Sequence, residues 1–161
     1  MITIKPTEAQ KDKAIRLSKQ LGSLKNSITK GEGNYAGLLA EIIMVDYLQG
    51  KHQSCRNYDI VLDGGKTVDV KTKRTTVYPK EYYACTIPKT SANQKCDIYV
   101  FCRYNTKNEH VYICGYIDKS TFFDRAHFGK KGEKDPYNTL VYKADCYEVA
   151  INDLKSIEDL L

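Results

Sequence analysis

The segment YDIVLDGGKTVDVKTK, residues 58–73, contains two short runs in which apolar and polar side chains alternate. Asp63-Gly64-Gly65 separates the runs, and a glycine-rich turn between two alternating runs is typical of a β-hairpin. Alternation with period two places every second side chain on the same face of a strand. The segment therefore predicts a hairpin in which Asp69 and Lys71 share one face, while the neighbouring valines face the core.

The register of this hairpin decides whether Asp59 lies beside Asp69. A three-residue loop with a glycine in the left-handed conformation pairs Leu62 with Lys66. It places the two aspartates directly opposite each other, with β-carbons about 4.5–5.5 Å apart. A two-residue loop pairs Asp59 with Val70 instead and puts the aspartates on opposite faces. The glycine pair permits both registers, and in the first one the carboxylates repel unless a cation lies between them.

The sequence around the hairpin predicts an α/β protein with a central mixed β-sheet flanked by helices. The expected helices cover residues 7–21, 35–48, 120–128 and the chain from 152 onward. The expected strands cover residues 58–62, 66–73, 82–87, 97–104 and 110–117, with a last strand at either 140–143 or 147–151. A chain of 161 residues fits one domain, residues 1–161. We expect it to have an N-terminal helix at 7–21, a core at about 35–117 that holds the candidate site, and a C-terminal basic loop and helix within 118–161.

The composition is that of a soluble globular protein, with 42% hydrophobic and 28% charged residues. No apolar run approaches the ~18–20 residues that span a bilayer, and the polar N-terminus lacks the apolar stretch of a secretion signal. We therefore expect the protein to act in a cytoplasm, where cysteines stay reduced. The lone fragment from His52 to Cys55 has no second ligand pair and gives little support for a zinc site.

The predicted helix at 35–48 is apolar almost all round, which is typical of a helix buried on most of its surface. Glu41 interrupts this pattern, because it shares a helical face with Leu38, Val45 and Leu48. A carboxylate in such surroundings is costly unless a cation or a strong donor meets it. Two interpretations remain open for Glu41: a structural partner such as Arg or Lys elsewhere in the chain, or membership of a functional site.

Glu41 in an apolar helix, Asp59 one strand later and Asp69-Val70-Lys71 ten residues beyond resemble the PD-(D/E)XK nuclease superfamily. This superfamily includes restriction enzymes, archaeal Holliday-junction resolvases and phage exonucleases. The resemblance covers residues 37 to about 117. It departs from the family pattern before Asp59, which follows Asn57-Tyr58 and not a proline. The resemblance implies a restriction-endonuclease-like fold.

The resemblance also implies a site for Mg²⁺ or Mn²⁺, held by Asp59, Asp69, the carbonyl of Val70 and Glu41. Oxygen ligands suit hard divalent cations, and Mg²⁺ is often bound through only one or two carboxylates. In the same family pattern, Lys71 orients or deprotonates the attacking water and stabilises charge on the phosphate. The implied catalytic residues are therefore Glu41, Asp59, Asp69 and Lys71, and the implied chemistry is metal-assisted hydrolysis.

Basic residues in and after the candidate site are interleaved with hydroxyl side chains, which suits contacts to phosphate. The net charge of +5 is compatible with a polyanionic partner but does not require one. We expect a first basic cluster to contact DNA: Lys71, Lys73, Arg74, Lys80, Lys89 and Lys95. A second cluster suits either a clamp on the nucleic-acid backbone or a solvated loop: Arg125, His127, Lys130, Lys131 and Lys134.

The sequence thus predicts a metal-dependent DNA endonuclease, a deoxyribonuclease that hydrolyses phosphodiester bonds in duplex or branched DNA. Analogy favours a homodimer with two symmetric sites. The small size suits a structure-specific enzyme of phage or mobile-element type, acting in the host cytoplasm. One alternative is a catalytically inactive DNA-binding or interference protein on the same fold. Another is an unrelated α/β protein with a surface hairpin, in which Glu41 lies far from Asp59 and Asp69.

Overall fold

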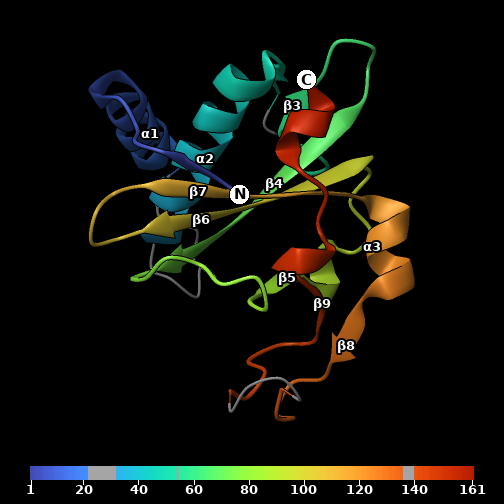
Figure 1. The fold of residues 1–161 in the computed structure, drawn as a ribbon. Helices are drawn as coiled ribbons and strands as arrows, with labels where there is room; N and C mark the ends of the chain where they lie inside the picture. The colour runs from blue at the N-terminus through green and yellow to red at the C-terminus, as the bar shows by residue number, and fades with distance from the viewer. Residues whose placement is uncertain (22–31, 54, 136–139) are drawn as a thin grey trace.

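The computed structural model describes residues 1–21, 32–53, 55–135 and 140–161 (Figure 1). The chain starts with β1 (Ile2–Ile4), α1 (Glu8–Leu21) and α2 (Glu32–Leu48). The middle of the chain contains β2 (Lys51–His52), β3 (Ile60–Val61), β4 (Thr67–Thr75), β5 (Ala84–Pro88), β6 (Ile98–Asn105) and β7 (Val111–Asp118). The remaining part contains α3 (Lys119–Arg125), β8 (His127–Gly129) and β9 (Cys146–Ala150). Short 3₁₀ turns are η1 (Lys89–Ser91), η2 (Ile151–Asp153) and η3 (Ile157–Leu160).

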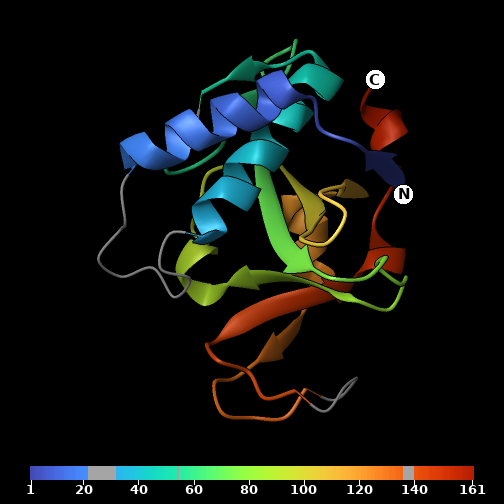
Figure 2. The same ribbon diagram turned by 90° about the vertical axis from the view of Figure 1, so that its left-hand side faces the viewer.

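The strands form two sheets that lie in separate layers. The larger sheet has six strands in the order β1-β7-β6-β4-β3-β2, and the smaller one has three in the order β5-β9-β8. Only the pairing of β4 with β6 is parallel in the larger sheet, which is therefore mixed. Helices α1 and α2 cover one face of the larger sheet, while α3 and the smaller sheet lie on its other side (Figures 1 and 2). The predicted mixed α/β architecture is confirmed.

The register of the β3–β4 hairpin is the one given by a three-residue loop. Ile60 pairs with Val68, and the N–H of Leu62 donates to the carbonyl of Lys66 at 2.8 Å. Gly64 and Gly65 have φ values of +91° and +86°, which residues other than glycine rarely adopt. Just before this ladder, the N–H of Asp59 donates to the carbonyl of Val68 at 2.9 Å, so Asp59 lies beside β4 next to the residue that precedes Asp69. The alternative with a two-residue loop is wrong.

Two hydrophobic clusters hold the layers together, one on each face of the larger sheet. The first contains Leu39, Met44, Ile60 and Val68 and packs α2 against β3 and β4. The second contains Tyr99 and Phe122 with residues of β5 and β9, and packs the smaller sheet and α3 against β6 and β7. Burying one large apolar side chain contributes about 1.5–3 kcal/mol, so the layers are stabilised mainly by these two clusters.

Both long helices follow from local sequence. At the start of α1, Thr7 and Gln10 form a reciprocal capping box: the Thr7 N–H donates to Gln10 Oε1 at 3.0 Å, and the Gln10 N–H donates to Thr7 Oγ1 at 3.2 Å. After α2, Gln49 has a positive φ of 51°, and the N–H of Gly50 donates to the carbonyl of Val45 at 3.2 Å. This left-handed residue ends the apolar helix.

The C-terminal part differs from the sequence prediction in two places. The helix expected at 120–128 stops at Arg125, because His127 to Gly129 pair with β9 as strand β8. The helix expected from Asn152 is replaced by the 3₁₀ turns η2 and η3. Of the two positions for a last strand, 147–151 is close to the observed β9, whereas Val141 forms only an isolated bridge with Lys134. Residues 136–138 of the predicted basic loop lie outside the described residues.

All six cysteines are free thiols, and five of them are buried. Cys85, Cys102 and Cys114 belong to β5, β6 and β7, where they pack as small apolar side chains. Among the described helices, none has the length and apolar character needed to cross a bilayer.

Gly115 lies where the C-terminal segment approaches β7, and we expect its replacement by alanine to destabilise the fold. Its φ is +143°, and an added β-carbon would lie 2.5 Å from the carbonyl oxygen of Lys155. Gly115→Ala should therefore lower the free energy of unfolding by roughly 2–3 kcal/mol, measured by urea denaturation. Gly132→Ala is the matched control, because Gly132 also has a positive φ but has open space around it. Equal losses in both variants would contradict the argument from close packing.

Candidate active site

Four polar side chains from three elements meet at the start of β4. Asp59 directly precedes β3, Asp69 and Lys71 lie in β4, and Glu41 lies in α2. Asp59 is 8% exposed and Asp69 only 2%, although neither belongs to the hydrophobic clusters. Buried carboxylates are unusual unless they are paired or bind a cation. These two aspartates are therefore the residues around which the site is built.

Asp59 lies near two other carboxylates, Glu41 and Asp69. Its Oδ2 accepts a hydrogen bond of 2.8 Å from the N–H of Val70, which ties the carboxylate to β4. Burial, and then the charges of Glu41 and Asp69, raise the pKa of Asp59 to about 7. Because both aspartates are buried and Glu41 acts on Asp59, the arrangement differs from the surface hairpin far from Glu41 that the sequence also allowed.

Asp69 is held by Lys71 and by Gln94, a residue from the segment before β6. Lys71 Nζ lies 2.6 Å from Asp69 Oδ2 and donates to Gln94 Oε1 at 3.0 Å. The amide of Gln94 donates to Asp69 Oδ1 at 3.3 Å and to the carbonyl of Arg56 at 2.8 Å. Burial raises the pKa of Asp69, and the positive charge of Lys71 opposes this shift. Gln94 thus fixes both the carboxylate and the lysine.

One oxygen of Asp69 is buried against a single cation. Oδ2 lies 2.6 Å from the ammonium group of Lys71, and this ion pair neutralises the carboxylate in the absence of a metal ion. A carboxylate oxygen is also the type of donor that a hard divalent cation prefers.

One neighbour of Glu41 is a histidine, whereas the sequence suggested only Arg or Lys as a structural partner. His52 Nε2 lies 3.4 Å from Glu41 Oε2, and the side chain of Glu41 is only 14% exposed. His52 belongs to β2, the edge strand that pairs with β3, so α2 and β2 together position Glu41 next to Asp59. The two interpretations of Glu41 are therefore not exclusive, because a structural contact holds it at the site.

The carbonyl of Val70 lies on the same edge of β4 as Asp59. In a β-strand the N–H and C=O of one residue point to the same side, and the N–H of Val70 points to the Asp59 carboxylate. Residues that could hold a cation are therefore Asp59, Asp69 and the Val70 carbonyl, with Glu41 next to them. As these side chains stand, no three acidic, histidine or cysteine groups of the described chain are arranged around a common point for a metal ion. The ammonium of Lys71 instead supplies the positive charge beside Asp69.

Lys73 does not join this site in the way the sequence suggested. Lys73 is an exposed residue, and its ammonium group donates to two residues of β5, to the carbonyl of Ala84 at 3.2 Å and to Thr86 Oγ1 at 2.5 Å. Burial, and then the charge of Arg103, lower the pKa of Lys73. The ammonium of Lys73 is thus held by β5 and is directed away from Asp69.

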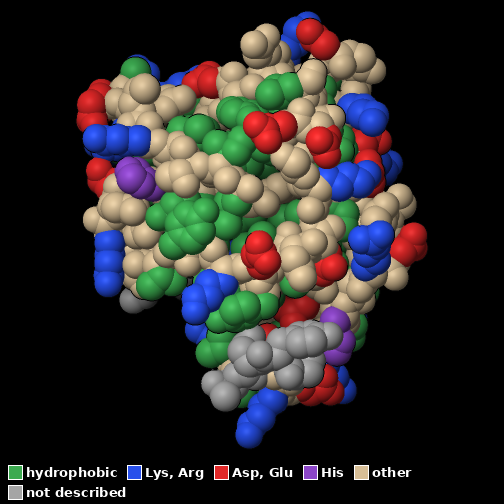
Figure 3. Space-filling view, viewed as in Figure 1, with side chains coloured by type: hydrophobic (Ala, Val, Ile, Leu, Met, Phe, Trp, Pro, Cys, Tyr) green, Lys and Arg blue, Asp and Glu red, His purple; other side chains and the backbone are tan. Residues whose placement is uncertain are grey.

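The other basic residues predicted to contact nucleic acid lie at the surface. These exposed residues are Arg74, Lys80, Lys89, Lys95, Arg125, Lys130, Lys131 and Lys134. Lys89 forms an ion pair of 3.5 Å with Asp145, and Lys80 lies over the ring of Tyr82. On the face seen in Figure 3, basic side chains are dispersed among acidic ones and do not form one continuous track. Surface charge on that face therefore identifies no path for DNA.

Three residues of the site carried little signal in the sequence. Gln94 and Lys119 come from chain segments far from the hairpin, and the ammonium of Lys119 donates to the carbonyl of Gln94. Lys119 also lowers the pKa of Asp69 through its charge. His52 was noted only as part of a zinc-like fragment, whereas its neighbour is Glu41. A hydrophobic pattern gives no information about such contacts between distant segments.

The sequence matches no protein-family profile and no curated protein. The family resemblance of this chain therefore rests on the residues of the site itself.

We expect Asp59→Asn to stabilise the metal-free protein above neutral pH. The pKa of Asp59 rises from 3.8 to about 7 in the fold, so the folded chain holds a proton that the unfolded chain has released between these values. Stability should therefore fall as pH rises through this window and stay low above it. At pH 8 in EDTA, the free energy of unfolding of Asp59→Asn should exceed that of the wild type by about 1–3 kcal/mol, measured by urea denaturation. Near pH 4 the two proteins should differ little.

Asp63→Asn is the matched control, since Asp63 is an exposed residue in the loop of the same hairpin. A destabilised Asp59→Asn protein at pH 8, or an equal gain in the control, would contradict the argument that repulsion and burial act on Asp59.

Proposed function

We propose that this protein is a metal-dependent nuclease that hydrolyses phosphodiester bonds in DNA, of the PD-(D/E)XK type. The observation that carries the proposal is the meeting of Glu41, Asp59, Asp69 and Lys71 at one largely buried place, where Lys71 pairs with Asp69 at 2.6 Å and Glu41 acts on Asp59. Simple structural ion pairing does not require two buried aspartates with a glutamate beside them and one lysine.

The donor set fits Mg²⁺ or Mn²⁺. Asp59, Asp69 and the Val70 carbonyl would hold the ion, and Glu41 would complete the site directly or through a water molecule. Because Lys71 now lies beside Asp69 Oδ2, its ammonium group would turn away from that oxygen when the ion binds. When bound, such an ion supplies positive charge for the phosphate and makes a water molecule more acidic.

The residues of the chain supply the remaining functions. The N–H of Val70 holds the Asp59 carboxylate, and Gln94 holds both Asp69 and Lys71, so the acidic groups are oriented before substrate arrives. Lys71 provides a cation that orients the attacking water and neutralises charge on the phosphate during attack. As the water gives up a proton and its oxygen bonds to phosphorus, the bond from phosphorus to the leaving oxygen breaks, and the leaving oxygen takes a proton.

The substrate class is DNA in duplex or branched form, and the working unit is a homodimer. The dimer part of the proposal is an analogy, since two symmetric sites allow cuts in both strands. A second candidate function is an inactive DNA-binding protein with the same arrangement of residues. It predicts DNA binding that no divalent cation converts to cleavage.

We expect purified protein to nick or cut supercoiled plasmid and branched DNA in Mg²⁺ or Mn²⁺ but not in EDTA. Lys71→Ala should lower the cleavage rate about 10²–10³-fold, because one preorganised cation at the phosphate is lost. Lys66→Ala is the matched control, since Lys66 is an exposed lysine at the start of the same hairpin arm and should cut like the wild type. Retained cleavage in Lys71→Ala would overturn the assignment of the site. DNA binding without cleavage in any metal would favour the inactive binding protein.

We expect Gln94→Ala to reduce the cleavage rate roughly tenfold or more while the affinity for DNA in EDTA stays the same. The variant frees both Lys71 and Asp69 from the amide that orients them. Single-turnover cleavage and fluorescence anisotropy separate these two effects. Gln20→Ala, which changes an exposed glutamine of α1, controls for the substitution itself. A loss of DNA affinity with an unchanged cleavage rate would show that Gln94 does not position the site.

A further inference from the structure

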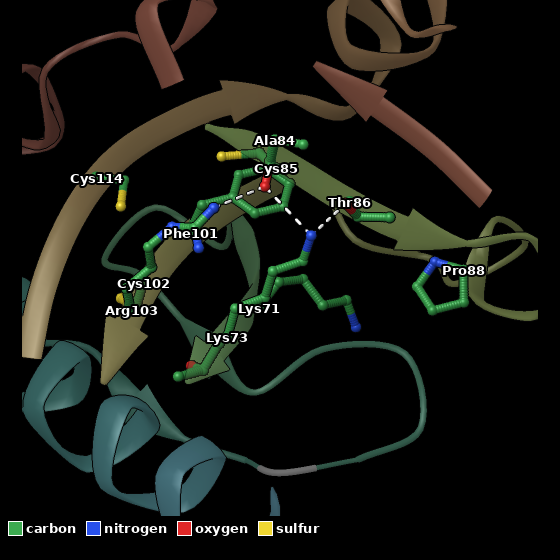
Figure 4. A pocket seen from close by; sticks show the side chains of 11 residues that line it. Lys71, Lys73, Ala84, Cys85, Thr86, Pro88, Phe101, Cys102, Arg103 and Cys114 are labelled. Carbon is green, nitrogen blue, oxygen red and sulfur yellow. Dashed lines mark hydrogen bonds between the residues drawn. The ribbon is translucent and has the colours of Figure 1, made fainter. Parts of the chain in front are cut away.

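A mostly apolar pocket that contains three basic side chains lies between the two sheets, next to the candidate active site (Figure 4). The pocket has a volume of about 270 Å³. Strands β4 and β6 form one wall with Lys71, Lys73 and Arg103, and β5 forms the opposite wall from Ala84 to Pro88. Lys71 is thus shared between the active site and this pocket.

Two cations of this pocket are direct neighbours. Lys73 and Arg103 are register partners on the parallel strands β4 and β6, so their side chains leave the same face of the sheet. Like charges opposite each other in a sheet are destabilising. Both nevertheless converge on one acceptor: Arg103 Nη2 donates to the Ala84 carbonyl at 2.9 Å and Lys73 Nζ to the same oxygen at 3.2 Å (Figure 4).

The two cations are only partly offset by acidic side chains of the described chain. Neither Lys73 nor Arg103 forms an ion pair with a carboxylate there. The charge of Glu148 acts on Lys73 from beyond ion-pair distance and raises its pKa. Two neighbouring cations thus face the charge of one more distant carboxylate.

The three cysteines that line the pocket do not supply the missing negative charge. Burial raises the pKa of Cys85, Cys102 and Cys114 above the usual range of a thiol, so all three are neutral near pH 7. They form an apolar part of the pocket wall. In such surroundings an anion that meets both cations is bound more strongly than in water.

We propose that this pocket is a phosphate-binding subsite for the DNA strand that the active site cuts. A phosphate group has a bulk of a few water molecules, each about 30 Å³, and fits the pocket. Lys73 and Arg103 present the charged donors that bind phosphate oxygens. Lys73 lies two residues beyond Lys71, about 6–7 Å along β4, so the bound phosphate is next to the one being hydrolysed.

This inference rests on the proposed nuclease function for the identity of the strand, but the pocket itself can be tested without cleavage. Inorganic phosphate in EDTA should raise the melting temperature of the wild type by about 3–6 °C at ten times its dissociation constant, compared with chloride at equal ionic strength. Lys73→Gln and Arg103→Gln should lose this shift. Both substitutions remove the positive charge and leave a neutral amide donor on a shorter side chain. Lys73→Arg keeps the charge and should retain the shift.

Two further variants distinguish this pocket from its neighbours. Lys71→Ala should keep the phosphate-dependent shift if the anion binds to Lys73 and Arg103, and would lose it if the anion binds at the active site. Lys66→Gln controls for removal of an exposed lysine. An equal phosphate shift in the wild type and in both glutamine variants would overturn the proposal. A severe loss of stability of both glutamine variants in chloride would also overturn the proposal, because it would show that the two cations serve only to hold β5.

DNA binding in EDTA, measured by fluorescence anisotropy, distinguishes a terminal phosphate from an internal phosphodiester as the ligand of the pocket. The ligands are one duplex with a 5′-phosphate, with a 5′-hydroxyl or with a 3′-phosphate, and a closed circle. If the pocket takes a terminal phosphate, Lys73→Gln should weaken binding about tenfold for only one of the phosphorylated ends. If it takes an internal phosphodiester, binding of all four DNAs should weaken alike. Wild-type affinity of both glutamine variants for every DNA would overturn the subsite. A wild type that shows the phosphate shift but cuts no DNA would refute the nuclease and leave the pocket in place.

Discussion

The loop between β3 and β4 sets the register on which the rest of the molecule depends. Gly64 and Gly65 both have positive φ, and the three-residue loop pairs Ile60 with Val68. A slip by one residue would turn Asp69 and Lys71 toward α2 and turn the valines of the core away from it. The hydrophobic core and the candidate site therefore require the same register, and a change in one would destroy the other.

The charged residues along β4 follow an order that packing of the core and of the helices does not require. Acidic groups gather at its start, where burial and mutual repulsion raise the pKa of Asp59, and cations gather two and four residues beyond Asp69. Each group alone lowers the stability of the fold. Proteins retain such costs where function requires them. A bound cation at the acidic end and a bound phosphate at the basic end would relieve both.

Much of this arrangement could be predicted from local sequence, because alternation and turn chemistry determine a hairpin. The face shared by Asp69 and Lys71 follows from period two, and the capping box at Thr7 follows from spacing. Strands β1 and β2 are too short to show a periodic pattern of apolar residues, and β8 forms because β9 pairs with it. The roles of Gln94 and Lys73 depend on how β5 and the segment before β6 cross the sheet, and no local pattern contains that information.

The parallel pairing of β4 with β6 also has a consequence for the order in which the molecule forms. Helix α2 and the β3–β4 hairpin involve neighbouring segments, and a hairpin closes within about 1–10 μs. Gln94 and β6 reach β4 only after a crossover of residues 76–97, and β5 gains its strand partner only from β9. On the ribosome, a growing chain therefore carries the acidic residues and the lysine well before the elements that orient them. The wall formed by β5 is completed only when β9 has been synthesised, so the pocket between the two sheets forms late.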